Sequence, residues 1–305
     1  MKILGISGGM HSCGLAYLKD GKPEFAFEEE RFNRVRTYKD FYKDLFRFPY
    51  ECGQNVWYNK DFDWNELDYI TSHYSAKVTE EIWDGIGLGP FPKEKFIKTN
   101  HHRAHCSLAY YCSGFEEDTL VVSIDAMGEK YSARYFIGSN GNLTDIGKIS
   151  DEFKSLGHYY AMLTEFLGFR RLKDEGKVVG TASHGKFNKD FYNVFNECIT
   201  IDGIKTDKDN GKVISGGIYE DFYKLWFEKH GSKFSSHLKN DIAYNGQLVF
   251  EEKILEIFNN LWKKHPNLRK VALAGGVFAN VKLNKRINEL EWVDEVFIAP
   301  PMGDE

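Results

Sequence analysis

The strongest constraint on the fold is a pattern of three short strands that occurs twice in the chain. Each copy has an apolar run, a glycine turn, a second strand, a hairpin turn and a third strand. The first copy covers residues 2–29 and turns at Asp20-Gly21, and the second covers residues 119–149 and turns at Asn140-Gly141. The copies share a pattern rather than a sequence. They predict two lobes of one topology, which would leave a cleft between them if they face each other.

Further periodic segments extend this α/β pattern. We expect a strand at 67–73, helices at 101–113, 155–168 and 241–264, and a final strand–turn–helix–strand unit at 269–274, 277–290 and 295–299. Asn100 is the expected N-cap of the helix at 101–113, and Gly114 its stop. The predicted organisation is a first lobe at 1–115 and a second lobe at 116–305, with an irregular, charged surface insertion near 186–240.

Composition excludes several classes of protein. The 305 residues are enough for one large domain or two smaller ones, each with a full core. The net charge of -5 argues against a general nucleic-acid binder and against affinity for an anionic membrane. Five cysteines without a CxxC pair argue against a disulfide framework or a thiolate zinc site. Since no segment reaches 18 apolar residues, we expect no membrane span and a cytoplasmic location.

The segment His101-His102-Arg103-Ala104-His105 is the sharpest chemical signal. Residues four apart share one face of a helix, so His101 and His105 can converge on one metal ion. His102 and His105, three apart, are a poorer pair. Imidazoles completed by carboxylates suit iron, manganese, zinc or cobalt. The alternative is a polar helix start with surface histidines.

Two carboxylates follow apolar strands. Asp125 ends the strand that begins at residue 119, and Asp304 follows the exit of the last strand. The carboxyl ends of strands are where α/β folds place ligands. The alternatives are a hairpin-turn aspartate for Asp125 and a free chain end for Asp304.

Glycine turns follow Asp125, join a strand to a helix near residue 275, and lie at the start of the chain. Gly128 allows backbone N–H groups to approach a phosphate, and Gly275-Gly276 expose amides before a helix. His11 follows the Gly8-Gly9 turn and could polarise a substrate carbonyl. Each of these turns is also common in proteins that bind nothing there.

Taken together, these segments resemble the NodU/CmcH family of O-carbamoyltransferases, which includes the tobramycin and cephamycin carbamoyltransferases. The matching segments follow one another along essentially the whole chain, and the ordered set is far more specific than any one of them. They are Leu4-Gly5-Ile6-Ser7 with His11 and Asp20-Gly21; Glu28-Glu29-Glu30-Arg31-Phe32-Asn33-Arg34; His101-His102-Arg103-Ala104-His105 with Tyr110-Tyr111-Cys112-Ser113-Gly114-Phe115; Glu175-Gly176-Lys177-Val178-Val179-Gly180; Asp241-Ile242-Ala243 with Gln247 and Phe250-Glu251; Gly275-Gly276-Val277 with Asn280 and Asn284; and Pro300 with Gly303-Asp304.

The resemblance implies a Kae1-like fold of the actin/Hsp70/sugar-kinase class, a duplicated RNase H-like α/β architecture in two lobes. It implies a divalent metal, with Fe(II) favoured and manganese or zinc as alternatives. The implied ligands are His101, His105, Asp125 and Asp304.

The resemblance also implies a reaction. The metal would hold the phosphate side of a carbamoyl-adenylate, and its nucleotide would lie against Gly128, Gly275, Gly276 and Asn280. The carbamoyl group would pass to a small-molecule hydroxyl acceptor, with His11 as the polarising or proton-transfer group. Residues 32–60 and 186–240 are the expected determinants of the acceptor.

In this family a YrdC-like domain makes the carbamoyl-adenylate from carbamoyl phosphate and ATP. No such domain is expected within this chain, so a YrdC-like domain or protein is the implied partner. Two other hypotheses stay open: a Kae1-like component that transfers threonylcarbamoyl to tRNA, and a non-catalytic nucleotide-binding fragment. The acidic net charge weighs against the tRNA hypothesis.

Overall fold

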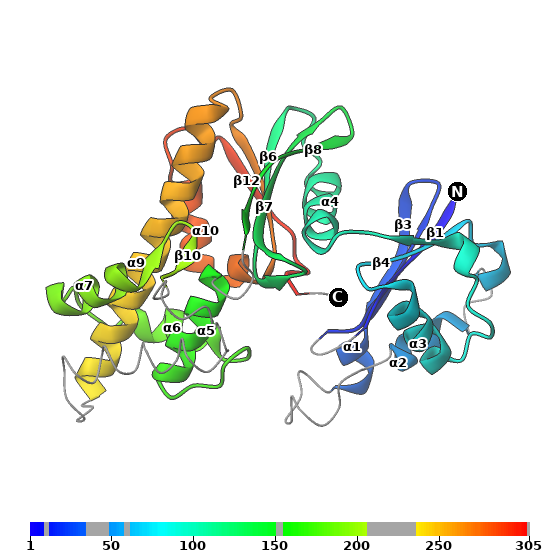
Figure 1. Ribbon diagram of the computed structural model, residues 1–305, viewed down its shortest axis with the longest axis horizontal. Helices are drawn as coiled ribbons and strands as arrows, with labels where there is room; N and C mark the ends of the chain where they lie inside the picture. The colour runs from blue at the N-terminus through cyan, green and yellow to red at the C-terminus, as the bar shows by residue number, and fades with distance from the viewer. Residues whose placement is uncertain (9–11, 35–48, 58–61, 151–154, 206–235, 304–305) are drawn as a thin grey trace. The chain divides into compact units, whose positions relative to one another are not determined.

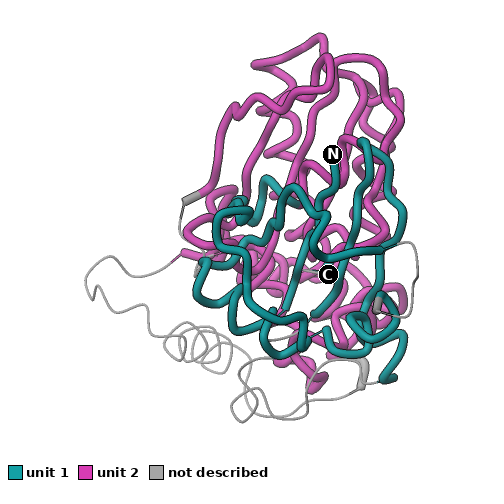
Figure 2. Tube along the Cα trace, turned by 90° about the vertical axis from the view of Figure 1, so that its right-hand side faces the viewer, with its two compact units in different colours: residues 1–104, 303–305 teal, residues 105–302 magenta. Residues whose placement is uncertain are grey.

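The computed structural model describes residues 1–8, 12–34, 49–57, 62–150, 155–205 and 236–303. The chain divides into two compact units, residues 1–104 with 303–305 and residues 105–302 (Figure 2). The division falls inside helix α4 (His101–Ser113), ahead of the boundary expected at residue 115.

The first unit is built on a five-stranded sheet in the order β3-β2-β1-β4-β5. Strand β1 runs antiparallel to β2 and parallel to β4. The strands are β1 (Lys2–Ser7), β2 (Gly14–Lys19), β3 (Lys22–Glu28), β4 (Tyr69–Ser72) and β5 (Phe96–Lys98). The helices are α1 (Glu29–Asn33), α2 (Tyr50–Trp57) and α3 (Ala76–Ile86). Apolar residues of the strands and of α2 and α3 form this unit's core, including Leu4, Ile70, Val56 and Trp83.

The second unit repeats the same topology. Its five-stranded sheet has the order β12-β11-β6-β7-β8, in which β6 runs antiparallel to β7 and parallel to β11 (Figure 1). The strands are β6 (Thr119–Gly128), β7 (Tyr131–Ser139), β8 (Asn142–Ser150), β11 (Lys270–Ala274) and β12 (Glu295–Ile298). Each unit therefore has a meander of three strands and two further parallel strands on the side of the first strand. The predicted duplication is confirmed.

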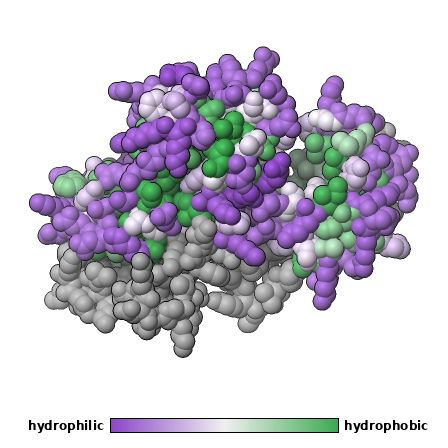
Figure 3. Space-filling view, turned by 45° about the horizontal axis from the view of Figure 1, so that its top comes forward, coloured by the Kyte–Doolittle hydropathy of each residue, from purple (hydrophilic) through white to green (hydrophobic). Residues whose placement is uncertain are grey.

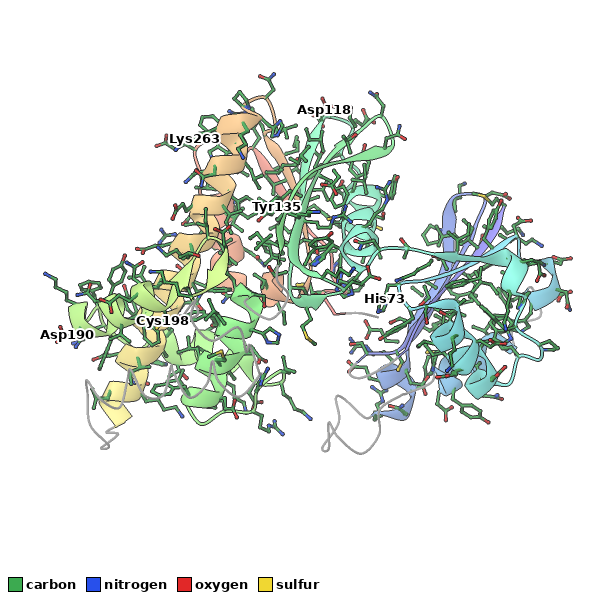
Figure 4. The ribbon with its side chains drawn as sticks, viewed as in Figure 1. His73, Asp118, Tyr135, Asp190, Cys198 and Lys263 are labelled. Carbon is green, nitrogen blue, oxygen red and sulfur yellow. The ribbon has the colours of Figure 1, made fainter. Side chains whose placement is uncertain are left out.

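Helices cover both faces of the second sheet. On one face lie α5 (Leu156–Phe166), α6 (Glu175–Ala182), α7 (Lys189–Cys198), α9 (Ser236–Lys264) and α10 (Val281–Asn288), and the large core on this side includes Tyr135 of β7 (Figures 1 and 4). Helix α4 covers the opposite face, where its Ala109 and Tyr110 pack against Val121, Phe136 and Ala272.

Strand alternation decides which side chains of β6 face α4. Successive side chains of a strand point to opposite faces. Leu120, Val122 and Ile124 join the large core, whereas Val121 packs on the α4 side. Asp125 lies an even number of positions after Val121, so its side chain is also directed to the face that α4 covers.

Several local predictions are confirmed. The Asn100 carboxamide accepts a hydrogen bond from Arg103 N at 3.1 Å, as expected of an N-cap. Gly114 ends the helix with a φ of 69°, a left-handed conformation that glycine adopts without strain. Asp20-Gly21 and Asn140-Gly141 all have positive φ, as expected of tight hairpins.

Other local predictions were wrong. The segment 186–240, expected to be irregular, contains α7 and the start of α9, and Phe191 and Phe195 of α7 are buried in the core. The helix expected at 277–290 is divided into a 3-10 turn (Gly276–Ala279) and α10, because the Asn280 side chain caps α10 by accepting from Leu283 N. Residues 206–235 of the expected insertion lie outside the described residues.

Hydrophilic residues dominate the face of the described chain seen in Figure 3, with apolar residues showing between them. Among the helices of the described segments, we find none with the length and apolarity needed to cross a lipid bilayer.

Candidate metal centre

Helix α4 places two histidines on one face. His101 is its first residue and His105 lies one turn further on, so the helix itself fixes the two imidazoles relative to each other. The next residue on this face, Ala109, packs against the second sheet. Both histidines are therefore directed inward, and only 6% of His101 and 7% of His105 is exposed. The alternative of surface histidines at a polar helix start is wrong.

Asp125 meets this face of α4 from β6. Its Oδ2 lies 3.3 Å from His105 Nε2, while its Oδ1 accepts a hydrogen bond from Ala126 N at 2.6 Å. The backbone bond fixes the plane of the carboxylate, so one oxygen remains directed at the histidine. The strand-end position predicted from the sequence thus places Asp125 beside the histidine pair.

His101, His105 and Asp125 form a donor set that fits a divalent metal. One ligand atom from each lies within 4.8 Å of the other two. Metal–nitrogen and metal–oxygen bonds of about 2.0–2.2 Å require neighbouring ligand atoms roughly 3–3.5 Å apart, in line with the 3.3 Å between His105 and Asp125. Imidazole with carboxylate suits iron, manganese or zinc better than calcium or Cu(I). The same 3.3 Å would also suit a direct His–Asp hydrogen bond, and metal content separates the two.

Two further histidines lie near this donor set. His102 is completely buried and its ring contacts that of His101, with centroids 5.2 Å apart. His73, labelled in Figure 4, follows the carboxyl end of β4 and its ring centroid lies 5.3 Å from that of His101. Sequence spacing gave no signal for His73, because β4 and α4 meet only in the folded chain.

Glycines bring neighbouring backbone segments close to Asp125. A Cβ atom at Gly276 would lie 3.2 Å from Asp125 Oδ1, and one at Gly157 would lie 2.7 Å from Ala126 N. Gly275 has a φ of 95°, which only glycine adopts readily. The turn after β11 and the start of α5 therefore both approach the end of β6, and the predicted Gly275-Gly276 turn lies beside the metal candidates.

Asn280 has a structural role in this part of the fold. Its carboxamide caps α10 and also exchanges hydrogen bonds of 2.9 and 3.1 Å with the buried Gln247. Gln247 in turn contacts Tyr160 and Glu251. The expectation that Asn280 contacts a nucleotide stays a prediction.

Of the remaining predicted site residues, the structure describes only Gly128. Gly128 is buried at the end of β6 and pairs with Tyr131 in the β6–β7 ladder, next to a turn at Glu129. Its contact with a nucleotide stays a prediction. His11 and Asp304 lie outside the described residues.

His158, whose pKa is affected by the charge of Asp125, and its neighbour Arg171 had no sequence signal. His158 follows Gly157 in the first turn of α5, and Arg171 Nη2 lies 3.4 Å from its Nδ1. Burial, and next the charge of Arg171, lower the pKa of His158 to about 4, while the charge of Asp125 acts in the opposite direction. Only the packing of α5 on the end of β6 could have identified them.

Comparisons with known proteins identify the family of the chain. The family model described as "Carbamoyltransferase N-terminus" matches residues 67–305. The chain belongs to this carbamoyltransferase family.

Relatives extend the similarity over the whole chain. Two uncharacterized proteins of Methanocaldococcus jannaschii are each 31% identical to it, over 88% and 99% of this chain. The nodulation protein NolNO of Sinorhizobium fredii is 24% identical over 100% of this chain and 48% of its own length. The chain spans about half the length of the curated relatives that it matches, 48% and 55% for the two Methanocaldococcus proteins.

A solved structure supports the fold. Full-length HypF, in its phosphate- and nucleotide-bound form, aligns with a TM-score of 0.56 and 14% identity, over 97% of this chain and 52% of HypF. Together with the duplicated sheets, this likeness confirms the predicted actin/Hsp70/sugar-kinase-like α/β fold.

Proposed function

We propose that this chain transfers a carbamoyl group from carbamoyl-adenylate to the hydroxyl of a small-molecule acceptor. The observation that carries the proposal is the buried cluster of His101, His105 and Asp125, in a chain of the carbamoyltransferase family. Nucleotide and phosphate in the solved form of HypF are in line with a nucleotidyl donor. A YrdC-like domain or protein would make the donor from carbamoyl phosphate and ATP, and the cytoplasm is the proposed compartment.

The proposed step exchanges one bond at the carbamoyl carbon. The acceptor oxygen forms a bond to this carbon, and the bond from the carbon to the adenylate phosphate oxygen breaks. The hydroxyl proton passes to a base, and the products are a carbamate ester and AMP. Negative charge develops on the carbamoyl oxygen and then on the departing phosphate, so groups that stabilise anions accelerate the step.

The chain's own residues would prepare this site. His101 and His105 would hold a divalent metal from one rigid helix, and Asp125 would hold it from the end of β6. The bound metal would supply Lewis acidity toward the developing negative charge. The Ala126 N–H orients the Asp125 carboxylate, and both histidines are buried, which limits the access of water to them. Asp304 as a further ligand and His11 as the proton acceptor complete the proposal.

The proposal is tested by supplying carbamoyl-adenylate with a panel of sugar and amino-sugar alcohols. AMP release and the mass of the carbamoylated acceptor are measured with and without Fe(II) or Mn(II). Asp125→Asn removes the charged ligand, and Asp118→Asn is its matched control, because Asp118 is exposed and precedes the opposite end of β6 (Figure 4).

We expect AMP release that requires both metal and acceptor. Asp125→Asn should lower the rate of AMP release by about 100-fold or more, because one group that stabilises the transition state electrostatically is lost. Asp118→Asn should leave the rate unchanged. Release that proceeds equally without acceptor or metal, or equally in Asp125→Asn, would contradict the proposal. Nucleotide binding without any release would favour the non-catalytic hypothesis.

A further inference from the structure

A polar pair, His158 and Arg171, lies where α5 approaches the carboxyl end of β6. His158 is the residue after Gly157, where an added Cβ atom would lie 2.7 Å from Ala126 N. Arg171, from the loop after α5, brings its Nη2 to 3.4 Å from His158 Nδ1. The pair is therefore tied to the same turn that carries Asp125.

The contact with Arg171 fixes which nitrogen of His158 carries the proton. A guanidinium group can only donate hydrogen bonds, so Nδ1 of His158 must be the acceptor. The proton of the neutral ring then resides on Nε2, which becomes a hydrogen-bond donor. Burial, reinforced by the charge of Arg171, lowers the pKa of His158 to about 4, which keeps the ring in this neutral form near pH 7.

The two adjacent arginines of this loop, Arg170 and Arg171, contact different partners. Arg170 is exposed and its guanidinium makes two hydrogen bonds, of 2.8 and 3.0 Å, to the Asp174 carboxylate. Leu172 has a φ of 58°, a left-handed conformation that leucine rarely adopts, and its N–H donates to Glu175 at 2.5 Å. Such strain is maintained only where the surroundings enforce it, and it often accompanies functional sites. Arg171, next to this residue, contacts His158, whereas Arg170 contacts Asp174.

We propose that Arg171 and His158 bind the phosphate group of the nucleotidyl donor beside Asp125. This inference rests on the proposed function, which supplies an adenylate as the donor. A phosphate next to the Asp125 carboxylate is repelled unless cations offset the charge, and Arg171 supplies one in addition to a metal. The guanidinium fork matches phosphate oxygens, and the His158 Nε2–H adds a neutral donor. These two residues thereby determine affinity for the phosphorylated donor.

The test compares AMP with adenosine, which lacks the phosphate. Binding of each is measured by titration calorimetry on the Mn(II)-loaded chain. Arg171→Gln should weaken AMP binding about 10- to 100-fold, the range for losing one charge-assisted hydrogen bond, and leave adenosine binding unchanged. Arg170→Gln is the matched control and should bind both as the parent chain does.

His158 is tested through two replacements. His158→Gln keeps an acceptor for Arg171 and an N–H donor, whereas His158→Leu keeps neither. AMP binding should be weakened by His158→Leu and largely retained by His158→Gln. Should Arg171→Gln fail to fold, Arg171→Lys keeps the charge but not the fork, and should show a smaller loss confined to AMP.

Three results would overturn the proposal. They are unchanged AMP affinity in Arg171→Gln, equal loss of AMP and adenosine affinity in a folded variant, and absence of AMP binding by the metal-loaded parent chain. Binding of AMP requires neither acceptor nor turnover. Phosphate binding by His158 and Arg171 can therefore be confirmed even if the chain transfers no carbamoyl group. The binding test and the transfer assay thus distinguish failure of this proposal from failure of the proposed function.

Discussion

Replacing Gly275 by alanine should strongly destabilise the second unit. Gly275 follows β11 with φ and ψ of 95° and 154°, a region that is essentially restricted to glycine. An alanine forced into this region costs about 1–3 kcal/mol. Its Cβ would also lie 2.5 Å from the backbone carbonyl oxygen of Ile124. Relieving that overlap requires β6 to shift at Ile124, next to Asp125, which adds about 1–3 kcal/mol to the cost of the substitution.

We therefore expect Gly275→Ala to lower the free energy of unfolding by about 2–6 kcal/mol, measured by urea unfolding followed by circular dichroism. The matched control is Gly180→Ala in α6, where an added Cβ would meet no atom within 4 Å. That control should be neutral or stabilising by up to about 1 kcal/mol, because alanine favours helix. A Gly275→Ala chain as stable as the parent would refute the close approach of Gly275 to the Ile124 carbonyl.

Two further predictions concern buried hydrogen bonds and acid stability. Gln247→Leu should cost about 2–4 kcal/mol of unfolding free energy in the same urea assay, because Gln247 is fully buried and its loss removes one hydrogen bond each from Tyr160, Glu251 and Asn280. A loss below about 1 kcal/mol would contradict this reasoning. Hydrogen bonds from Arg170, foremost among the causes, hold the pKa of Asp174 well below its ordinary value of 3.8. The ionised carboxylate therefore stabilises the fold above that pH and loses this effect as the pH falls below it. Asp174→Asn should be less stable than the parent at pH 7, with a difference that narrows on acidification, and a difference independent of pH would count against the Arg170–Asp174 pair.

The duplicated sheet and the first helix turn of α4 were predictable because their signals are local. Alternation and glycine turns specify the two meanders, and Asn100 with Gly114 specifies the limits of α4. The spacing of His101 and His105 is a property of any helix, so their convergence followed from the sequence as well.

What the sequence missed depends on contacts between distant segments. Strand β5 has three residues, too few to show a hydrophobic period. Helix α7 is polar enough to resemble a surface loop, although its Phe191 and Phe195 are buried in the core. His158 and Arg171 lie 13 positions apart and meet only because the loop after α5 folds back. No spacing rule links such residues to Asp125.

We expect His101, His105 and Asp125 to bind one divalent metal. The most direct test is elemental analysis of the purified chain after anaerobic incubation with Fe(II), beside His105→Ala and the control His265→Ala from the loop after α9. We expect close to one equivalent of iron in the parent and the control, and a much smaller amount in His105→Ala, since loss of one of the two imidazole ligands weakens metal binding. A parent chain that retains no metal, or a His105→Ala chain that retains as much as the parent, would contradict the claim.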